Sequence, residues 1–302
     1  MPGLLASLGV APFGVAPPNV LSPPASVPVH ALLLLADGRF PAGGHAHSAG
    51  VEAAVGDGRI TDIASLTAFT EGRLRTVGLV DAAFAMATAV HLGPCRPRGM
   101  AEQEARSAGP ADQDVLRRNG PAERGAPGLR LPPAGERPPA PLDDVAALRV
   151  LRILDDEVDA RTPAPPLRVA SRRLGRQLLR VGSRCWPSAL LALAADAAHD
   201  PHQCVAFGLV ALAAGLDVES IGHLVAHHAV TTPMQAGVRL LGLDPYAVAA
   251  ATAALAGVAA AVVTAATAHA AGPVAALPAR GATLVDLAAM AHATADGRLF
   301  AT

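Results

Sequence analysis

Lysine is absent from this chain of 302 residues, and all 24 of its basic residues are arginine. The absence excludes Schiff-base lysine chemistry and the lysine of a nucleotide-binding P-loop. With 25 acidic residues, the formal net charge is −1, whereas nucleic-acid-binding domains carry a clear basic excess. The composition therefore argues against a nucleic-acid partner.

Aromatic residues are also scarce, at 3% of the chain, although the hydrophobic class reaches 51% because alanine is abundant. Alanine is the best helix former, a poor strand former, and buries little apolar area per residue. No segment shows the alternation of a β-strand, and several show the helical period. We predict an all-α fold, a single helical-bundle domain of about eight to ten closely packed helices.

Cysteine is limited to Cys95, Cys185 and Cys204, with no Cys-x-x-Cys pair. An odd number of distant cysteines argues against a disulfide framework or a zinc knuckle and fits a reducing compartment. We expect a cytoplasmic protein.

Composition divides the chain into segments. Residues 1–28 are proline-rich and have no positive n-region, which favours a flexible arm over a signal peptide. Residues 93–142 are rich in Gly, Pro and Arg without a sustained period, which predicts a disordered insertion. Residues 29–92 and 143–302 carry helical periodicity and should form one domain, with Pro233 separating two of its helices.

No charged residue occurs from 245 to 279, and apolar runs of about 18 residues or more are transmembrane candidates. This run is mostly alanine, with threonines and a histidine inside it and no aromatic belt apart from Tyr246. We therefore predict a packed Ala-rich helix and no membrane span. Its small residues also make it a candidate surface for self-association.

Histidines occur in two patterns that could bind a metal. His45 and His47 alternate within a Gly-rich segment, where an extended backbone would let both reach one ion; the alternative is a loop whose polar residues cap the following helix. His223 and His227 share one helix face. His228 falls on the apolar stripe, which predicts a hydrogen-bonded core histidine.

Charged residues cluster on two predicted helices. The segment 168–184 contains six arginines and no acid, which indicates either a docking surface for an acidic partner or a solvated helix face. The acids of the preceding helix should form its solvent-exposed side. The arginines are Arg168, Arg172, Arg173, Arg176, Arg180 and Arg184, and the acids are Asp155, Asp156, Glu157 and Asp159.

Catalytic motifs are missing. The chain has no phosphate loop and no dinucleotide Gly fingerprint, and Ser48 does not lie in a Gly-x-Ser-x-Gly elbow. Nothing assembles a catalytic set, so we predict that the protein is not an enzyme.

Taken together, four stretches resemble the UreF family of urease accessory proteins. The most specific contains the Pro-x-Gly-Gly loop and the Ser-x-Gly-x-Glu segment, although the family usually has aromatics where His45 and His47 stand. The resemblance covers about residues 30–92 and 143–300. The stretches are 32–60, 161–179, 201–216 and 236–245.

The resemblance implies an all-helical homodimer without catalysis of its own. Such proteins bridge the UreD/UreH accessory protein and the UreG GTPase, and the assembly delivers nickel to the urease apoprotein in a GTP-dependent step. It implies no tightly bound cofactor, nickel only in transit, and neither nucleic acid nor membrane as a partner.

The resemblance also carries individual residues over. Glu52 and Arg239 are expected to orient the loop or meet the GTPase, and the glycines to allow close backbone approach. His45 and His47 remain candidate metal ligands. The structural positions are Pro41, Gly43, Gly44, Gly50, Gly175 and Gly208, and the partner-binding positions are Ser48, Glu52, Arg168, Arg172, Arg176 and Arg239; Ser171 and His202 match as well.

Two other classes of protein remain open. One is a metal-dependent helical enzyme that uses His45 and His47. The other is a helical DNA-binding regulator with a turn at 215–217, although the helix after that turn would present Glu219, His223 and His227 and no arginine.

Overall fold

The computed structural model describes residues 28–93, 142–197, 200–293 and 300. Every regular element in these ranges is helical, so the all-α prediction is confirmed. The predicted arm and insertion lie almost entirely outside the described residues. The α-helices are α1 (Pro28–Ala36), α2 (Val51–Gly56), α3 (Ile63–Arg73), α4 (Leu79–Leu92), α7 (Asp144–Arg161), α8 (Pro165–Cys185), α9 (Ala189–Asp196), α10 (Gln203–Ala213), α11 (Val218–Leu241), α12 (Pro245–Ala254), α13 (Ala256–Ala270) and α14 (Thr283–His292), with short helices η1 (Gly44–Ala46), η2 (Leu74–Gly78) and η3 (Val274–Ala276).

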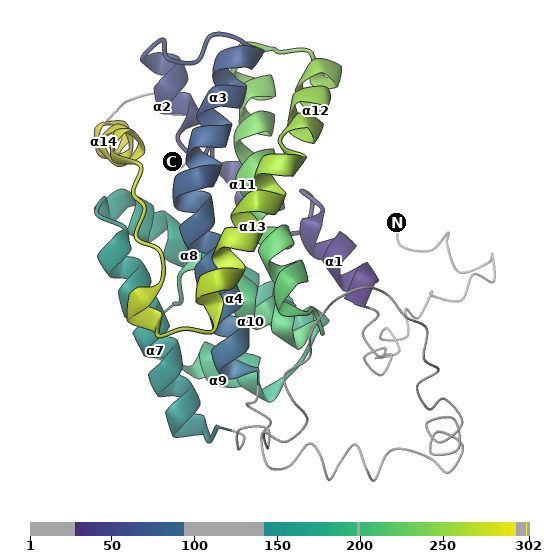
Figure 1. Ribbon diagram of the computed structural model, residues 1–302, viewed down its shortest axis with the longest axis vertical. Helices are drawn as coiled ribbons and strands as arrows, with labels where there is room; N and C mark the ends of the chain where they lie inside the picture. The colour runs from purple at the N-terminus through teal and green to yellow at the C-terminus, as the bar shows by residue number, and fades with distance from the viewer. Residues whose placement is uncertain (1–27, 94–141, 198–199, 294–299, 301–302) are drawn as a thin grey trace, which may run out of the picture.

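Helix α4 lies at the centre of the bundle and packs against α7, α10, α11 and α13 (Figure 1). Most of its residues are buried, and many are alanine. Small side chains let neighbouring helices come close. The approach is tightest at Gly208 of α10, where a Cβ atom would lie 2.4 Å from the carbonyl oxygen of Ala85 and 2.6 Å from Cβ of Thr88.

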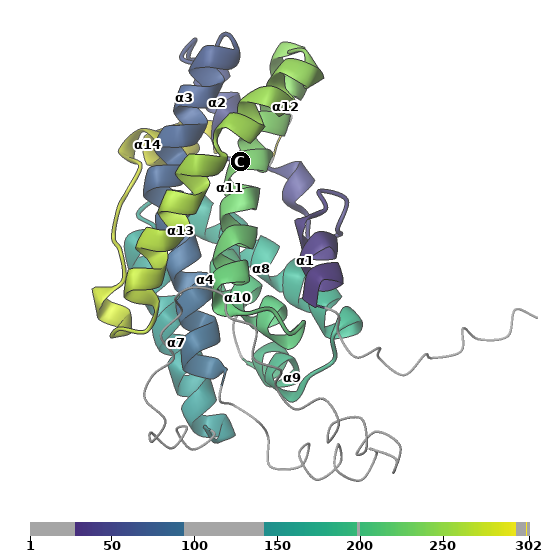
Figure 2. The ribbon, with the colours of Figure 1, turned by 45° about the vertical axis from the view of Figure 1, so that its right-hand side comes forward.

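The remaining helices cover two opposite sides of this centre. Helix α8 packs on α10, and α14 packs on α8 and α2. Helix α1 contacts α10 and α11 on the other side of the molecule, as Figures 1 and 2 both show. The two halves of the sequence therefore build one bundle.

Two predicted helix boundaries are wrong. Pro233 lies inside α11, which continues through it, because this buried proline sits in a helix whose contacts with α3, α4 and α13 offset one missing backbone hydrogen bond. The Ala-rich run forms two helices, α12 and α13, that meet at 41°. They meet at Leu255, which is buried and whose N–H donates to the carbonyl of Thr252.

None of the helices in the described ranges combines, by itself, the length and the apolar composition of a membrane span. The bent pair α12–α13 passes that test on length and composition alone. In this structure α13 packs against α4 and α11.

Helices α3 and α4 are joined through η2, a π-helical segment, so residues 63–92 form one continuous helical run. In a regular α-helix, side chains eight positions apart differ in direction by about 80°. A π segment is wider and underwinds the helix, which reduces this difference. Arg73 and Asp81, on either side of η2, consequently face nearly the same side.

We expect Gly208→Ala to lower the free energy of unfolding by about 2–3 kcal/mol, because the added Cβ meets backbone and Cβ atoms of α4 that cannot rotate away. Gly72→Ala is the matched control, since its Cβ would meet nothing within 4 Å and alanine favours helix by about 0.5–1 kcal/mol. Urea denaturation measures both. Equal stability of the two variants would contradict the close packing of α10 on α4.

Candidate functional site

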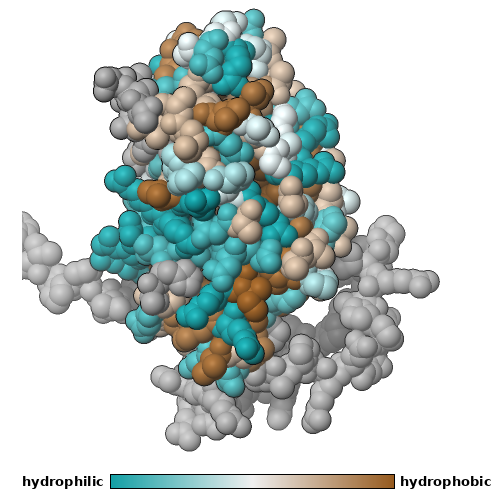
Figure 3. Space-filling view, turned by 90° about the vertical axis from the view of Figure 1, so that its left-hand side faces the viewer, coloured by the Kyte–Doolittle hydropathy of each residue, from teal (hydrophilic) through white to brown (hydrophobic). Residues whose placement is uncertain are grey.

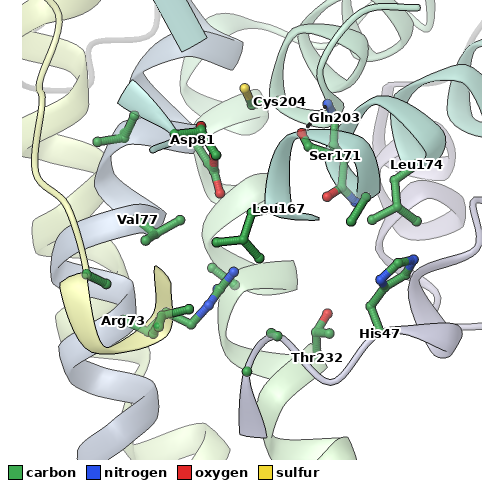
Figure 4. Close-up of a pocket in the computed structure, with 18 of the residues that line it drawn as sticks. His47, Arg73, Val77, Asp81, Leu167, Ser171, Leu174, Gln203, Cys204 and Thr232 are labelled. Atoms are coloured by element: carbon green, nitrogen blue, oxygen red, sulfur yellow. Dashed lines mark hydrogen bonds between the residues drawn. The ribbon is translucent and has the colours of Figure 1, made fainter. Parts of the chain in front are cut away.

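A cavity of about 180 Å³ lies between the central helices and two covering segments. Its walls come from α3, η2, α4, α7, α8, α10 and α11, and it is covered by the Gly-rich loop, the segment that leads into α14 and the start of α14. Figure 4 shows the apolar part of the wall, which includes Val77, Leu167 and Leu174. The volume far exceeds the roughly 10–15 Å³ needed for one water, so the cavity can hold a small molecule.

Arg73 and Asp81 are two charged groups of the inner wall and extend into this cavity (Figure 4). Burial raises the pKa of Asp81 to about 6, and the nearby Arg73 charge only partly opposes that shift. Burial likewise lowers the pKa of Arg73. The Nε atom of Arg73 is fully enclosed and has no hydrogen-bond partner. The position of these two residues therefore disfavours the charged form of each.

The Gly-rich loop forms one side of the cavity. Gly43 and Gly50 have φ angles of 82° and 90°, which suit glycine. Gly44 lines the cavity, and the carbonyl of Pro41 accepts a hydrogen bond from Gln177 at 3.2 Å. The loop is thereby fastened to α8.

The loop also positions His47, which is 7% exposed and lines the cavity. The side chain of His45 is outside the described part of the structure. Among the described residues, no three His, Cys, Asp or Glu side chains come together in a group that could bind a metal. A metal at His45 and His47 stays a prediction.

The later histidines separate into two environments. His223 and His227 are exposed on α11. His228 donates from Nε2 to the carbonyl oxygen of Leu35 at 2.8 Å, and burial lowers its pKa to about 4. The prediction of a hydrogen-bonded core histidine at 228 is confirmed.

The acids of α7 are not all on a solvent-exposed side, so that prediction is wrong for Asp155. Asp155 is fully buried; it accepts from Arg172 at 2.6 Å and from the backbone N–H of His202 at 2.7 Å. Asp159 accepts from the other terminal nitrogen of Arg172, also at 2.6 Å. The helical period could not reveal this, because an arginine of α8 comes to lie beside these acids only after folding.

His202 completes this ionic network beneath the surface. Its Nε2 lies 2.9 Å from Asp159 and its Nδ1 lies 3.0 Å from the hydroxyl of Ser171. Burial lowers the pKa of His202, so at neutral pH the ring is uncharged, donates to Asp159 and accepts from Ser171. Burial would raise the pKa of Asp159, but hydrogen bonds from Arg172 and His202 bring it below its usual value.

This Ser171–His202–Asp159 order is that of a hydrolase relay, yet its surroundings suit a structural link. The hydroxyl of Ser171 accepts the N–H of Gln203 at 3.1 Å, so this donor is engaged by the serine itself and cannot stabilise an oxyanion. The His202 side chain is fully buried. The network links α7 and α8 to the start of α10. Helix α8 also approaches the segment before α10 closely at Gly175, where a Cβ would lie 2.0 Å from the carbonyl oxygen of Pro201.

The arginines of α8 divide into internal and external groups. Arg168 donates to the carbonyls of Thr162 and Pro163, and Arg176 pairs with Asp200 at 2.6 Å. Arg173, Arg180 and Arg184 are exposed and, within the described ranges, make no ion pair. Positions 173, 180 and 184 repeat at helical spacing and so form one stripe, which we call the arginine stripe.

A second polar cluster joins the loop to the C-terminal end of the chain. Glu52 accepts from the backbone N–H of Phe300 at 3.0 Å and lies 3.4 Å from His292. The guanidinium of Arg239 stacks over the ring of Phe300 at 4.5 Å. Ser48 is fully buried and accepts from the N–H of Glu52 at 3.3 Å, so it supports this cluster from inside. We call these residues the Glu52 cluster.

The resemblance indicated Glu52 and Arg239 as candidate site residues, and both contact Phe300 in the structure. Sequence reasoning missed Arg73 and Asp81. The available signal was Asp81 itself, an acid inside the apolar run 79–92. Its partner eight positions earlier could not be inferred, because the π segment that turns both residues to one cavity has no sequence signature.

Comparison with known proteins finds similarity to one family. Residues 140–256 match the family model described as UreF. The urease accessory protein UreF of Mycolicibacterium vanbaalenii is 36% identical over 225 residues, which are 74% of this chain and 78% of that protein. The urease accessory protein UreF of Mycobacterium sp. (strain JLS) is 35% identical, over 74% of this chain and 79% of that protein. That of Mycobacterium tuberculosis (strain H37Rv) is 32% identical, over 73% and 77%.

We expect Asp81→Asn to change the pH dependence of stability. The pKa of Asp81 is about 6 in the folded chain against an ordinary 3.8, so between these values the folded form holds the extra proton. Wild type should therefore lose up to about 3 kcal/mol of stability as pH rises from about 4 to about 6, and the variant should not. Urea denaturation across this range tests it, and parallel profiles would contradict the buried position of Asp81.

Proposed function

The chain belongs to the UreF family of urease accessory proteins, and on that premise we propose that it is the adaptor that joins the UreD/UreH accessory protein to the UreG GTPase. The resulting assembly delivers nickel to apo-urease in a GTP-dependent step. The observation that carries this proposal is identity of 32–36% to curated UreF proteins over about three quarters of the chain. As an accessory protein it is not an enzyme.

The distribution of polar groups supports an adaptor. The Ser171–His202–Asp159 contacts link helices, whereas the arginine stripe points outward from α8. The side of the molecule that carries α7, α8 and α14 gathers hydrophilic side chains across its middle (Figure 3). Exposed guanidinium groups that form no ion pair with any described residue suit an acidic protein surface, which they can bind through bidentate hydrogen bonds.

The Glu52 cluster offers a second surface, on another part of the bundle. It combines residues of α2, α11 and the C-terminal end, so binding of a protein there would depend on how these three segments pack. Arg239 is exposed, and its guanidinium stacks over Phe300. In the proposal, this cluster meets the GTPase and the arginine stripe contacts another member of the assembly.

Nickel is cargo in this proposal, and the chain has no resident cofactor. The homodimer implied by the resemblance belongs to the same proposal, because two copies would present each surface twice. Sedimentation of the purified chain tests the oligomeric state.

A DNA-binding regulator fits the described surface poorly. Helix α11 would be the reading helix, yet it has Glu219 in its first turn and exposes His223 and His227, whereas phosphate contacts come mainly from Arg and Lys. A metal-dependent enzyme would need a third ligand beside His45 and His47. Neither alternative has an observation in its favour.

We expect the double variant Glu52→Gln/Arg239→Ala to reduce co-purification of the UreG GTPase at least about tenfold, a loss of about 1.4 kcal/mol, and to lower nickel-dependent urease activation. The matched control is Glu71→Gln/Arg75→Ala, which removes an exposed Glu–Arg pair between the end of α3 and η2. Unchanged capture of the GTPase by the first variant would refute the assignment of the Glu52 cluster.

Reversing the charges of the arginine stripe tests the other proposed surface. Arg173→Glu/Arg180→Glu/Arg184→Glu should abolish assembly of the complete complex, and wild-type assembly should weaken with added salt, because exposed charges are screened. Arg39→Glu/Arg149→Glu/Arg152→Glu, at three exposed arginines outside α8, makes the same change in net charge and is the control. If both charge reversals assemble equally well, α8 is only a solvated helix face.

A further inference from the structure

Arg73 has hydrogen-bonding capacity that no described residue uses. Its Nε is enclosed without a partner, and its guanidinium points into the cavity (Figure 4). An enclosed donor that is left unpaired is costly, and Arg remains protonated in proteins. The side chain therefore favours a group that can accept hydrogen bonds inside the cavity.

Asp81 faces Arg73 from across the same space (Figure 4). The two residues interact electrostatically, but no hydrogen bond or ion pair joins them in the described structure. The pKa of about 6 means that modest stabilisation of the neutral acid protonates Asp81 near neutral pH. A protonated carboxyl group could then donate a hydrogen bond into the cavity.

Three other ionisable groups of the helical wall face this space, but each is either uncharged or already engaged by other partners. Burial lowers the pKa of His228 to about 4 and raises the pKa of Cys204 well above its usual value, so both are uncharged at neutral pH. Arg161 is engaged by Glu157 and by the carbonyls of Ala275, Leu277 and Pro278.

Three further groups lie on the covering segments. Arg280, on the segment that leads into α14, and Asp286, in the first turn of α14, bring opposite charges, and burial raises the pKa of Asp286. His47 lies on the Gly-rich loop. None of the three belongs to the helical run that carries Arg73 and Asp81.

We propose that this cavity binds a short-chain aliphatic carboxylate such as acetate, whose oxygens accept hydrogen bonds from Arg73 while Asp81, protonated on binding, donates to one of them. A planar carboxylate matches the guanidinium fork. The alkyl group lies against Val77, Leu167 and Leu174. No covalent bond changes: binding takes one proton from solvent onto Asp81. The site is independent of the adaptor function.

The chemistry of the pair selects a monocarboxylate over other small ligands. A phosphate dianion would place two negative charges against Asp81, whose single proton cannot neutralise both. A neutral amide could bridge the ionised pair, but it would take up no proton. Proton uptake therefore distinguishes the proposed ligand class.

Calorimetric titration of the full chain with acetate, in two buffers of different ionisation enthalpy, tests the site. Uptake of one proton per acetate is expected above pH 7, with affinity falling about tenfold per pH unit. Arg73→Met should weaken binding at least tenfold, while Arg152→Met, on the exposed face of α7, should leave it unchanged.

Asp81→Asn keeps the proposal testable if the Arg73 variant fails to fold. It should bind acetate at least as tightly as wild type at pH 7.5, without proton uptake and without dependence on pH. Four results would overturn the proposal: no acetate binding by wild type in the millimolar range, equal binding of acetamide, equal binding of inorganic phosphate, or unchanged binding by folded Arg73→Met.

Discussion

The close approach of helices to α4 is the constraint on which the bundle depends. Alanines along α4, and Gly208 where α10 crosses it, bring backbones nearly into contact. Such packing replaces the area that aromatic side chains would otherwise bury. Contacts of this kind tolerate little added volume, because interiors are close-packed and their backbone atoms cannot rotate away.

Buried charge is handled in two different ways around this centre. Between α7, α8 and α10, Asp155, Asp159, Arg172 and His202 satisfy one another through hydrogen bonds of 2.6–2.9 Å. Removing one member would leave its partners buried and uncompensated, so the network specifies how these helices meet. Across the cavity, Arg73 and Asp81 remain apart, and the strain shows in the raised pKa of Asp81. The first arrangement is structural, and the second leaves room for a ligand.

Internal polar networks and exposed charged groups occupy different parts of the molecule. The internal networks hold the bundle together, while the arginine stripe and Arg239 of the Glu52 cluster are exposed; Glu52 and His292 are largely buried. Because the Glu52 cluster contains residues from α2, α11 and the C-terminal end, a partner bound there would report on the packing of three distant segments. An adaptor that coordinates several proteins benefits from such a surface.

The sequence by itself determined the helical class, because alanine content and the 3.6-residue period are local properties, and its motifs were sufficient to indicate the UreF family. It also placed His228 in the core. It could not determine that α11 passes through Pro233, that Asp155 is buried against Arg172, or that Arg73 and Asp81 share a cavity. Those outcomes depend on which side chain of one helix meets which side chain of another, and only the tertiary packing decides that.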